Sequence, residues 1–312
     1  MPIAFQCWYK SPHSTFDAPI HPPICTGMPS LLSRANCAVR SMFRAPVRAV
    51  AGSIGFDVVR RTPKPDAAVA AFEMLLQLRL ALDEVRDARE RRFLLECAKH
   101  VGGSKSQLLQ DVFAMHSVDF KPGGFFVEFG ATNGVTLSNT HLLEVRFGWK
   151  GILAEPARCW TAALRANRNC AIDTRCVWTV TGEKLQFMET SNAELSTVGT
   201  FGSRVDAHRT TRTINETYAV ETITLVDLLQ AHNAPRQVDY LSIDTEGSEY
   251  SILSQFDFDA FDIKVITVEH NYVQSDRDQI HRLLTSKGYA RTFEKLSRWD
   301  DWYVKNGQNA GA

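Results

Sequence analysis

Acidic side chains close several short apolar segments of this 312-residue chain, and they are the side chains best suited to chemistry. A carboxylate can accept a proton, hold hydroxyl groups or bind a cation. An Asp before a helix also acts as a cap, so each acid could equally serve a structural role. Taken together they indicate a binding or catalytic site, and the set comprises Glu128, Glu155, Asp173, Asp244, Glu246 and Glu269.

The segments that carry these acids alternate between apolar strands and helical stretches, which predicts parallel strands joined by crossover helices. Ligands bind beyond the carboxyl ends of the strands in an open parallel sheet, so we expect the acids to meet at one edge. The expected elements are buried strands over 124–130, 151–156, 170–173, 238–247 and 262–271, a helix over 138–148, a hairpin over 177–189 that turns at Thr181 and Gly182, and a closing antiparallel pair from 289–296 and 300–305. The polar stretch 190–219 is expected to be a loop that serves as an acceptor lid.

The first 65 residues have the composition of a leader that does not pack. They carry eight Lys or Arg against two Asp, and nine of the twelve prolines. Such a segment buries too little apolar surface to offset its ordering entropy. Arg40, Arg44 and Arg48 lie four residues apart, so the alternative is a basic helix in weak contact with a membrane surface, although Pro46 interrupts it.

The chain is therefore divided into four predicted parts. Residues 1–65 form the leader, and residues 66–103 form one long amphipathic helix in which Asp87 pairs with Arg91. Residues 104–305 form the main domain, and residues 306–312 form a flexible tail. The predicted fold class is α/β, with a mostly parallel sheet, an antiparallel closing hairpin, and the N-terminal helix and flexible leader before them.

Composition excludes several classes of protein. The formal net charge is zero, which argues against a nucleic-acid partner. We find neither an apolar run long enough for a transmembrane helix nor a signal peptide, and the expected location is cytoplasmic. The seven cysteines contain no C-x-x-C pair, which favours reduced thiols over disulfides or a zinc site.

The loop after the first strand, "GATNGV", favours one kind of ligand over another. Thr132 and Val135 stand where a dinucleotide-binding loop needs glycines, so a pyrophosphate would be crowded. A ligand with an amino-acid end, a ribose and an adenine but no phosphate suits the loop better, and that ligand is S-adenosylmethionine. Gly130 and Gly134 would let the backbone approach its amino-acid end, Glu155 would hold both ribose hydroxyls, and Asp173 would meet the adenine amine.

The motifs "SQLLQD", "GGFFVEFGATNGVTLSNT", "GWKGILAEP", "VDYLSIDTEGSEYSIL", "VITVEHN" and "DDWYV" resemble those of FkbM-type S-adenosylmethionine-dependent methyltransferases. The resemblance covers about residues 104 to 305. It implies a Rossmann-like methyltransferase fold and O-methylation of a small-molecule or glycan hydroxyl. The family-style residues that it implies are Glu128, Gly130, Asn133 and Gly134 for the cofactor, Glu155 for its ribose, and Asp244, Glu246 and Gly247 after the fourth strand.

Two mechanisms remain open for this expected reaction. His270 is the best base by residue type, because its ordinary pKa lies near neutrality, and a buried structural histidine is the alternative. Asp244, Glu269 and Asn271 form an oxygen-rich set that could instead hold Mg²⁺. A nicotinamide-dependent oxidoreductase and a non-catalytic scaffold of the same fold are the other functions to be tested.

Overall fold

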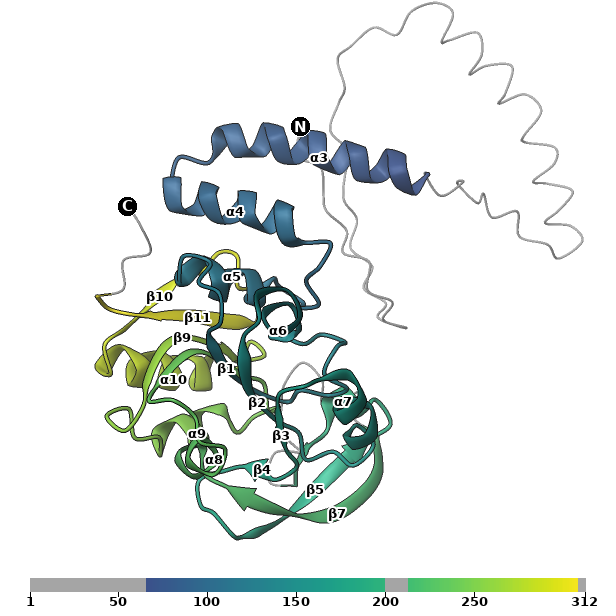
Figure 1. Ribbon diagram of the computed structural model, residues 1–312, viewed down its shortest axis with the longest axis vertical. Coiled ribbons are helices and arrows are strands. Elements are labelled where there is room, and N and C mark those ends of the chain that lie inside the picture. Colours follow the sequence, from purple (N-terminus) through teal and green to yellow (C-terminus); the bar gives the residue numbers. More distant parts are fainter. Residues whose placement is uncertain (1–65, 200–212, 308–312) are drawn as a thin grey trace, which may run out of the picture. The chain divides into compact units, whose positions relative to one another are not determined.

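The computed structural model of this chain describes residues 66–199 and 213–307 (Figure 1). The chain divides into two units, Met1–Phe72 and Glu73–Ala312. Within the first unit, residues 66–72 are described, and they include the start of helix α3 (Ala67–Glu84). The predicted basic leader, its alternative membrane helix and the end of the predicted tail lie outside the described residues.

The predicted single N-terminal helix is wrong, because the structure has two helices there. Helix α3 ends at Glu84, and α4 (Ala88–His100) begins after Asp87. The Asp87 backbone is extended, and its carboxylate accepts the Glu90 N–H at 2.7 Å, so this residue caps α4. The predicted i,i+4 pair of Asp87 and Arg91 is therefore wrong, and the Arg91 guanidinium lies 4.0 Å from the Asp83 carboxylate instead.

A seven-stranded sheet forms the centre of the described part of the second unit, in the order β10-β11-β9-β8-β1-β2-β3. The pairs among β3, β2, β1, β8 and β9 are parallel, whereas β11 is antiparallel to both β9 and β10. This arrangement confirms the predicted fold class. The strands are β1 (Phe125–Phe129), β2 (Lys150–Ala154), β3 (Ala171–Asp173), β8 (Gln237–Ile243), β9 (Asp262–Glu269), β10 (Tyr289–Thr292) and β11 (Asp300–Lys305).

Helices cover both faces of this sheet (Figure 1), and the buried strand residues alternate between the two faces. Phe126 and Leu153 face the cluster that contains residues of α4, α5, α6 and α7, whereas Val127 and Ile152 face the cluster that contains residues of α8, α9 and α10. Both faces are buried, which explains why the strands read as continuous apolar runs. The helices after α4 are α5 (Gln110–Ser117), α6 (His141–Phe147), α7 (Thr161–Asn167), α8 (Leu225–Ala231), α9 (Glu249–Ser254) and α10 (Gln274–Ser286).

A second, four-stranded sheet lies between β3 and α8 in the sequence, and it corrects the predicted hairpin. Its described strands are β4 (Cys176–Val177), β5 (Lys184–Thr190), β6 (Thr197–Val198) and β7 (Ile214–Ile223), in the order β4-β7-β5-β6. The chain does turn at Gly182, where φ is +86°. However, β4 and β5 do not pair with each other, because β7 lies between them.

The prediction of an unbroken loop over 190–219 is also wrong. The stretch contains a short 3-10 helix (Ala193–Leu195), strand β6 and the first residues of β7. On β7, Tyr218 and Val220 are buried while Ala219 and Glu221 are exposed, so the strand has one wet face. Residues 200–212 lie outside the described part, and the role of a lid stays a prediction.

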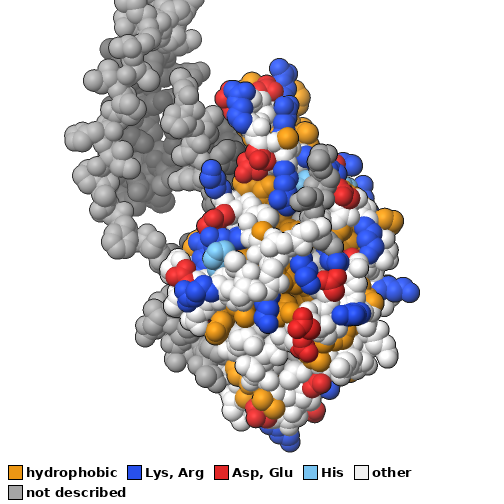
Figure 2. Space-filling view, turned by 90° about the vertical axis from the view of Figure 1, so that its left-hand side faces the viewer, with side chains coloured by type: hydrophobic (Ala, Val, Ile, Leu, Met, Phe, Trp, Pro, Cys, Tyr) orange, Lys and Arg blue, Asp and Glu red, His pale blue; other side chains and the backbone are white. Residues whose placement is uncertain are grey.

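The surface of the described residues mixes charges of both signs. On the face shown in Figure 2, Lys and Arg side chains are interspersed with Asp and Glu side chains. Among the described residues, no helix combines the length and the apolar character needed to cross a membrane.

Candidate functional site

The carboxyl ends of β1 and β8 lie close together at Gly130. This residue has a φ of +71°, and a Cβ added to it would lie 2.1 Å from the backbone carbonyl oxygen of Asp244. The Gly130 N–H also donates to the Ala154 carbonyl at 3.1 Å, and the Glu155 N–H donates to the Asp173 carbonyl at 3.0 Å. The ends of β1, β2, β3 and β8 are thereby joined into one edge.

Glu128 organises the polar loop that follows β1. Its buried carboxylate accepts hydrogen bonds from the Ser138 hydroxyl at 2.9 Å, from the Asn139 N–H at 2.7 Å and from the Thr140 hydroxyl. Burial raises the pKa of Glu128, while the charge of Arg168, 3.9 Å away, lowers it. The small polar residues after the strand therefore satisfy a buried acid. Direct contact between Glu128 and a cofactor stays a prediction.

Asn133 and Gly134 give this loop its shape. The Asn133 side-chain oxygen accepts the N–H groups of Val135 at 2.9 Å and Thr136 at 2.8 Å. Gly134 has a φ of +78°, and a Cβ there would lie 2.6 Å from the Arg168 side chain. Both residues are thus accounted for by contacts within the protein, and their contact with a cofactor also stays a prediction.

Glu155, at the end of β2, has the geometry expected of a ribose-binding acid. Its side-chain oxygens accept the N–H groups of Thr132 at 2.8 Å and Ala157 at 2.9 Å. A carboxylate oxygen has two acceptor positions, so one position on each oxygen remains for a hydroxyl. Burial raises the pKa of Glu155 to about 7 despite these two hydrogen bonds. Hydroxyl donors would favour the charged form, and the residue therefore fits the predicted cofactor.

Asp173, at the end of β3, is engaged by two basic side chains. Its carboxylate lies 2.6 Å from a guanidinium nitrogen of Arg175 and 2.9 Å from Nε2 of His232. Burial raises its pKa, but the hydrogen bonds from Arg175 and His232 outweigh that effect and hold the pKa below its ordinary value. An adenine amine would have to share this carboxylate with them.

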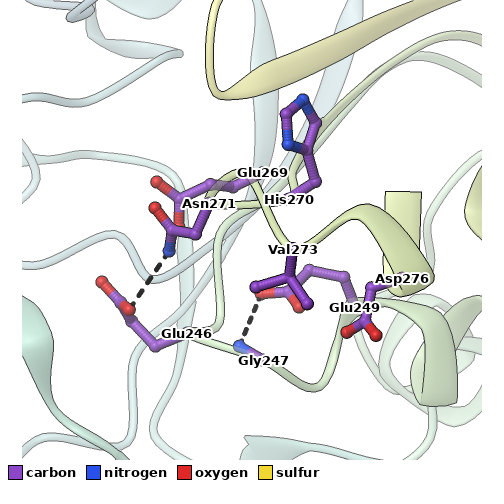
Figure 3. Close-up of a pocket in the computed structure, with 8 residues that line it drawn as sticks. All are labelled: Glu246, Gly247, Glu249, Glu269, His270, Asn271, Val273 and Asp276. Atoms are coloured by element: carbon purple, nitrogen blue, oxygen red, sulfur yellow. Dashed lines mark hydrogen bonds between the residues drawn. The ribbon is translucent and has the colours of Figure 1, made fainter. Parts of the chain in front are cut away.

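Three carboxylates converge where β8 and β9 end. Ligand oxygens of Asp244, Glu246 and Glu269 all lie within 4.8 Å of one another. The Asn271 side-chain amide donates to Glu269 at 2.8 Å and to Glu246 at 3.4 Å, and Figure 3 shows these three side chains directed toward one another. We call Asp244, Glu246, Glu269 and Asn271 the acid cluster. Three of its members, Glu246, Glu269 and Asn271, line a pocket together with Gly247, Glu249, His270, Val273 and Asp276.

The backbone at the acid cluster is strained. Glu246 has a φ of +58° and Asn271 a φ of +46°, in the left-handed region that costs a residue with a side chain about 1–2 kcal/mol. The Glu249 carboxylate closes the turn around Glu246 by accepting the N–H groups of Thr245 at 3.0 Å and Gly247 at 2.9 Å. Strain of this kind persists where surrounding contacts hold it, and it concentrates at functional sites.

The pKa values of Asp244 and Glu269 in the acid cluster are raised above their ordinary values. Burial is the main cause that raises the pKa of Asp244 to about 7, and the charges of Asp300 and Glu249 raise it further. The pKa of Glu269 lies well above its ordinary value, first through burial and then through the charges of Asp244 and Glu246. A pKa near 7 suits a group that must accept a proton at neutral pH.

His270 does not join the acid cluster. Figure 3 shows its imidazole directed away from Glu246 and Glu269; His270 directly follows the last residue of β9, and successive side chains of extended backbone point to opposite sides. Nδ1 accepts the Tyr272 N–H at 3.1 Å, and Nε2 lies 3.9 Å from Asp301 on the other side. Burial is the main cause that lowers its pKa. The ring therefore orders the turn after β9, although His270 also lines the pocket, and its role as a base stays a prediction.

Asp300 belongs to the same edge and was missed from the sequence. It lies opposite Glu269 in the antiparallel pair of β9 and β11, and Gln110 of α5 donates to its carboxylate at 2.9 Å. Burial raises its pKa to about 7. An antiparallel strand begins at the edge of the sheet where its parallel neighbours end. The position of Asp300 at the start of the predicted last strand therefore already indicated that it lies beside the other acids.

Comparison with solved structures finds methyltransferases of low sequence identity. Methyltransferase FkbM from Methylobacillus flagellatus KT is 12% identical, with a TM-score of 0.38, and the match covers 88% of this chain and 71% of that chain. Precorrin-6y C5,15-methyltransferase from Geobacter metallireducens GS-15 is 10% identical, with a TM-score of 0.35, and the match covers 62% of this chain and 85% of that chain. A methyltransferase from Pyrococcus furiosus is 13% identical, with a TM-score of 0.33, over 69% and 96% of the two chains.

Comparison of sequences is more decisive. No curated protein matches this chain. Residues 128–291, however, match the family model of the methyltransferase FkbM domain, which confirms the resemblance drawn from the motifs. Because this match spans more than half of the 312 residues, the chain belongs to the FkbM methyltransferase family.

Proposed function

We propose that this protein transfers a methyl group from S-adenosylmethionine to a hydroxyl of a sugar, a glycan or another natural product. Membership of the family implies S-adenosylmethionine as the methyl donor. When bound, this cofactor supplies an electrophilic methyl group on a positively charged sulfur. One observation supports oxygen as the acceptor: the carboxylates of Asp244, Glu246 and Glu269 converge next to the Gly130 edge.

The cofactor side of this proposal rests on Glu155. Its two remaining acceptor positions would hold the two ribose hydroxyls, and the Thr132 and Ala157 N–H groups fix its orientation. Glu128 and Asn133 would act indirectly, by holding the loop that borders the amino-acid end of the cofactor. Asp173, already bonded to Arg175 and His232, would form the edge of the adenine pocket.

The acceptor side rests on the acid cluster. A hydroxyl becomes a good nucleophile when its proton leaves as the new bond forms, and the accepting group works best with a pKa near the working pH. Asp244 meets that condition, and Glu246 is its neighbour in the cluster. His270 would contribute by holding the Asn271–Tyr272 turn, because its Nδ1 is already bonded to the Tyr272 N–H.

Metal-assisted methyl transfer is the second candidate, and the observation that supports it is the convergence of three carboxylates. Three carboxylates with oxygens within 4.8 Å of one another can surround one Mg²⁺, and Asn271 adds an amide oxygen after rotation of its side chain. The ion would bind the acceptor hydroxyl and lower its pKa. Treatment with EDTA should then abolish turnover and added Mg²⁺ should restore it. Full activity in EDTA would leave the carboxylate as the base.

Two experiments test the proposal on the full chain. Calorimetric titration with S-adenosylmethionine and with NAD should show saturable binding of the first alone. Release of S-adenosylhomocysteine is then measured with a panel of methyl glycosides and phenols as acceptors. Asp244→Asn should remove turnover while leaving cofactor affinity within about twofold, because it changes the acid cluster and keeps its shape. Cofactor binding without turnover on any acceptor would favour a non-catalytic scaffold.

A further inference from the structure

The small sheet contacts the acid cluster through one buried hydroxyl. Thr197 of β6 is 1% exposed, and its side-chain oxygen donates to the backbone carbonyl of Glu246 at 3.2 Å. These two residues are 49 positions apart in the sequence. Glu246 holds a left-handed backbone conformation at a φ of +58°, and its carboxylate accepts the Asn271 amide. Such a conformation persists where surrounding contacts hold it, and the Thr197 hydroxyl supplies one of them beside the Glu249 carboxylate.

The sheet behind Thr197 is anchored on the cofactor side as well. Thr197 pairs with Met188 of β5, and the neighbouring residue of β5, Phe187, pairs with Tyr218 of β7. The Tyr218 hydroxyl accepts the Arg158 N–H at 2.9 Å and donates to Glu189 at 2.8 Å. Arg158 follows Glu155 by three positions. The sheet therefore touches the loop after the ribose-binding acid and the turn that carries Glu246.

We propose that Thr197 is a positioning residue of the acceptor site, and that the small sheet is in this way part of the catalytic machinery. The inference rests on the proposed function, because it assumes that Glu246 faces the acceptor. Without the hydroxyl, the Glu246 carbonyl loses the hydrogen bond from Thr197, which weakens the hold on the left-handed turn. The carboxylate of Glu246 then leaves the acid cluster for part of the time, and turnover falls in proportion.

The test compares three substitutions that differ in one hydroxyl. Thr197→Val keeps the shape of the side chain and removes the donor, and Thr197→Ser keeps the donor. Thr222→Val is the matched control, since Thr222 belongs to β7 of the same sheet and its hydroxyl also donates to a backbone carbonyl, that of Val180. For each variant we measure cofactor affinity by calorimetry, kcat and KM with methyl glucoside, methyl galactoside and phenol, and amide hydrogen exchange over residues 244–249.

Thr197→Val should lower kcat about tenfold, the loss expected from one hydrogen bond, with cofactor affinity unchanged. Its amides at Thr245 and Gly247 should exchange faster, and Thr197→Ser should restore both readouts. Thr222→Val should change neither, even if it lowers the melting temperature. Normal exchange in Thr197→Val, or a Ser variant as impaired as the Val variant, would overturn the inference. If no probe is methylated by the wild type, the proposed function is in doubt, and hydrogen exchange still decides the role of Thr197.

Discussion

Cofactor affinity should depend on pH through Glu155. Burial raises the pKa of this carboxyl to about 7 in the free protein, and ribose hydroxyls bind its charged form. At pH 6 only about one molecule in eleven carries the charge, and at pH 8 about ten in eleven do. If the bound form stays ionised, the affinity for S-adenosylmethionine should rise about tenfold from pH 6 to pH 8, and binding near pH 6 should release a proton.

Calorimetry at pH 6, 7 and 8, in two buffers of different ionisation enthalpy, measures both quantities. Glu155→Gln removes the titration, and it should bind weakly with little dependence on pH, because one amide N–H must also face the Thr132 or Ala157 N–H. Asp244→Asn is the matched control, since that carboxyl also has a pKa raised to about 7. A flat profile in the wild type, or the same tenfold rise in Glu155→Gln, would refute the assignment of the ribose to Glu155.

Three further predictions concern the framework of the site. Gly130→Ala should destabilise the protein by more than about 2 kcal/mol in urea unfolding, because its left-handed φ and the Asp244 carbonyl at 2.1 Å leave no room for a Cβ; an unchanged midpoint would contradict this. His270→Asn should keep most of the turnover, since an Asn side chain can accept the Tyr272 N–H, whereas His270→Ala should lose it; equal loss in both would return His270 to the role of base. Burial lowers the pKa of His116 to about 4, so the folded protein binds a proton at this residue less readily than the unfolded chain does. The free energy of unfolding should therefore fall by up to about 3 kcal/mol between pH 6.5 and pH 4. His116→Phe should lose less stability over that range, and equal losses in both proteins would contradict this role of His116.

The central strands of the large sheet could be predicted because each of them is buried on both faces. The segments around Phe126, Ile152, Leu241 and Ile266 read as apolar runs between glycines and acids, and few elements other than a doubly buried strand produce that pattern. The small sheet gave no such signal. Its strand β7 is wet on one face and pairs with β5, which lies well before it in the chain, so neither composition nor spacing indicated the pairing.

The site could be predicted where position along a strand determines position in space. Asp244, Glu246 and Glu269 meet because parallel strands end at one edge. His270 directly follows Glu269 in the chain. Successive side chains of extended backbone point to opposite sides, so the imidazole lies on the side away from the acid cluster. The hydrogen-bond partners of individual side chains could not be predicted from the sequence. In the structure the side chains of Glu128, Asn133 and Asp173 are hydrogen-bonded to other residues of the protein.

The pairing of β4 with β7 makes the small sheet an insertion in the main domain whose two ends lie side by side. Cys176 lies beside Thr222, and the Trp178 N–H donates to the Ile223 carbonyl at 2.8 Å, so the chain leaves and returns at one point. An insertion with adjacent ends can be lengthened, shortened or exchanged at little cost in loop-closure entropy and without altering the register of the large sheet. Because Thr197 and Tyr218 of the small sheet also contact the Glu246 turn and the loop after Glu155, a graft between β4 and the end of β7 has to keep both of these contacts.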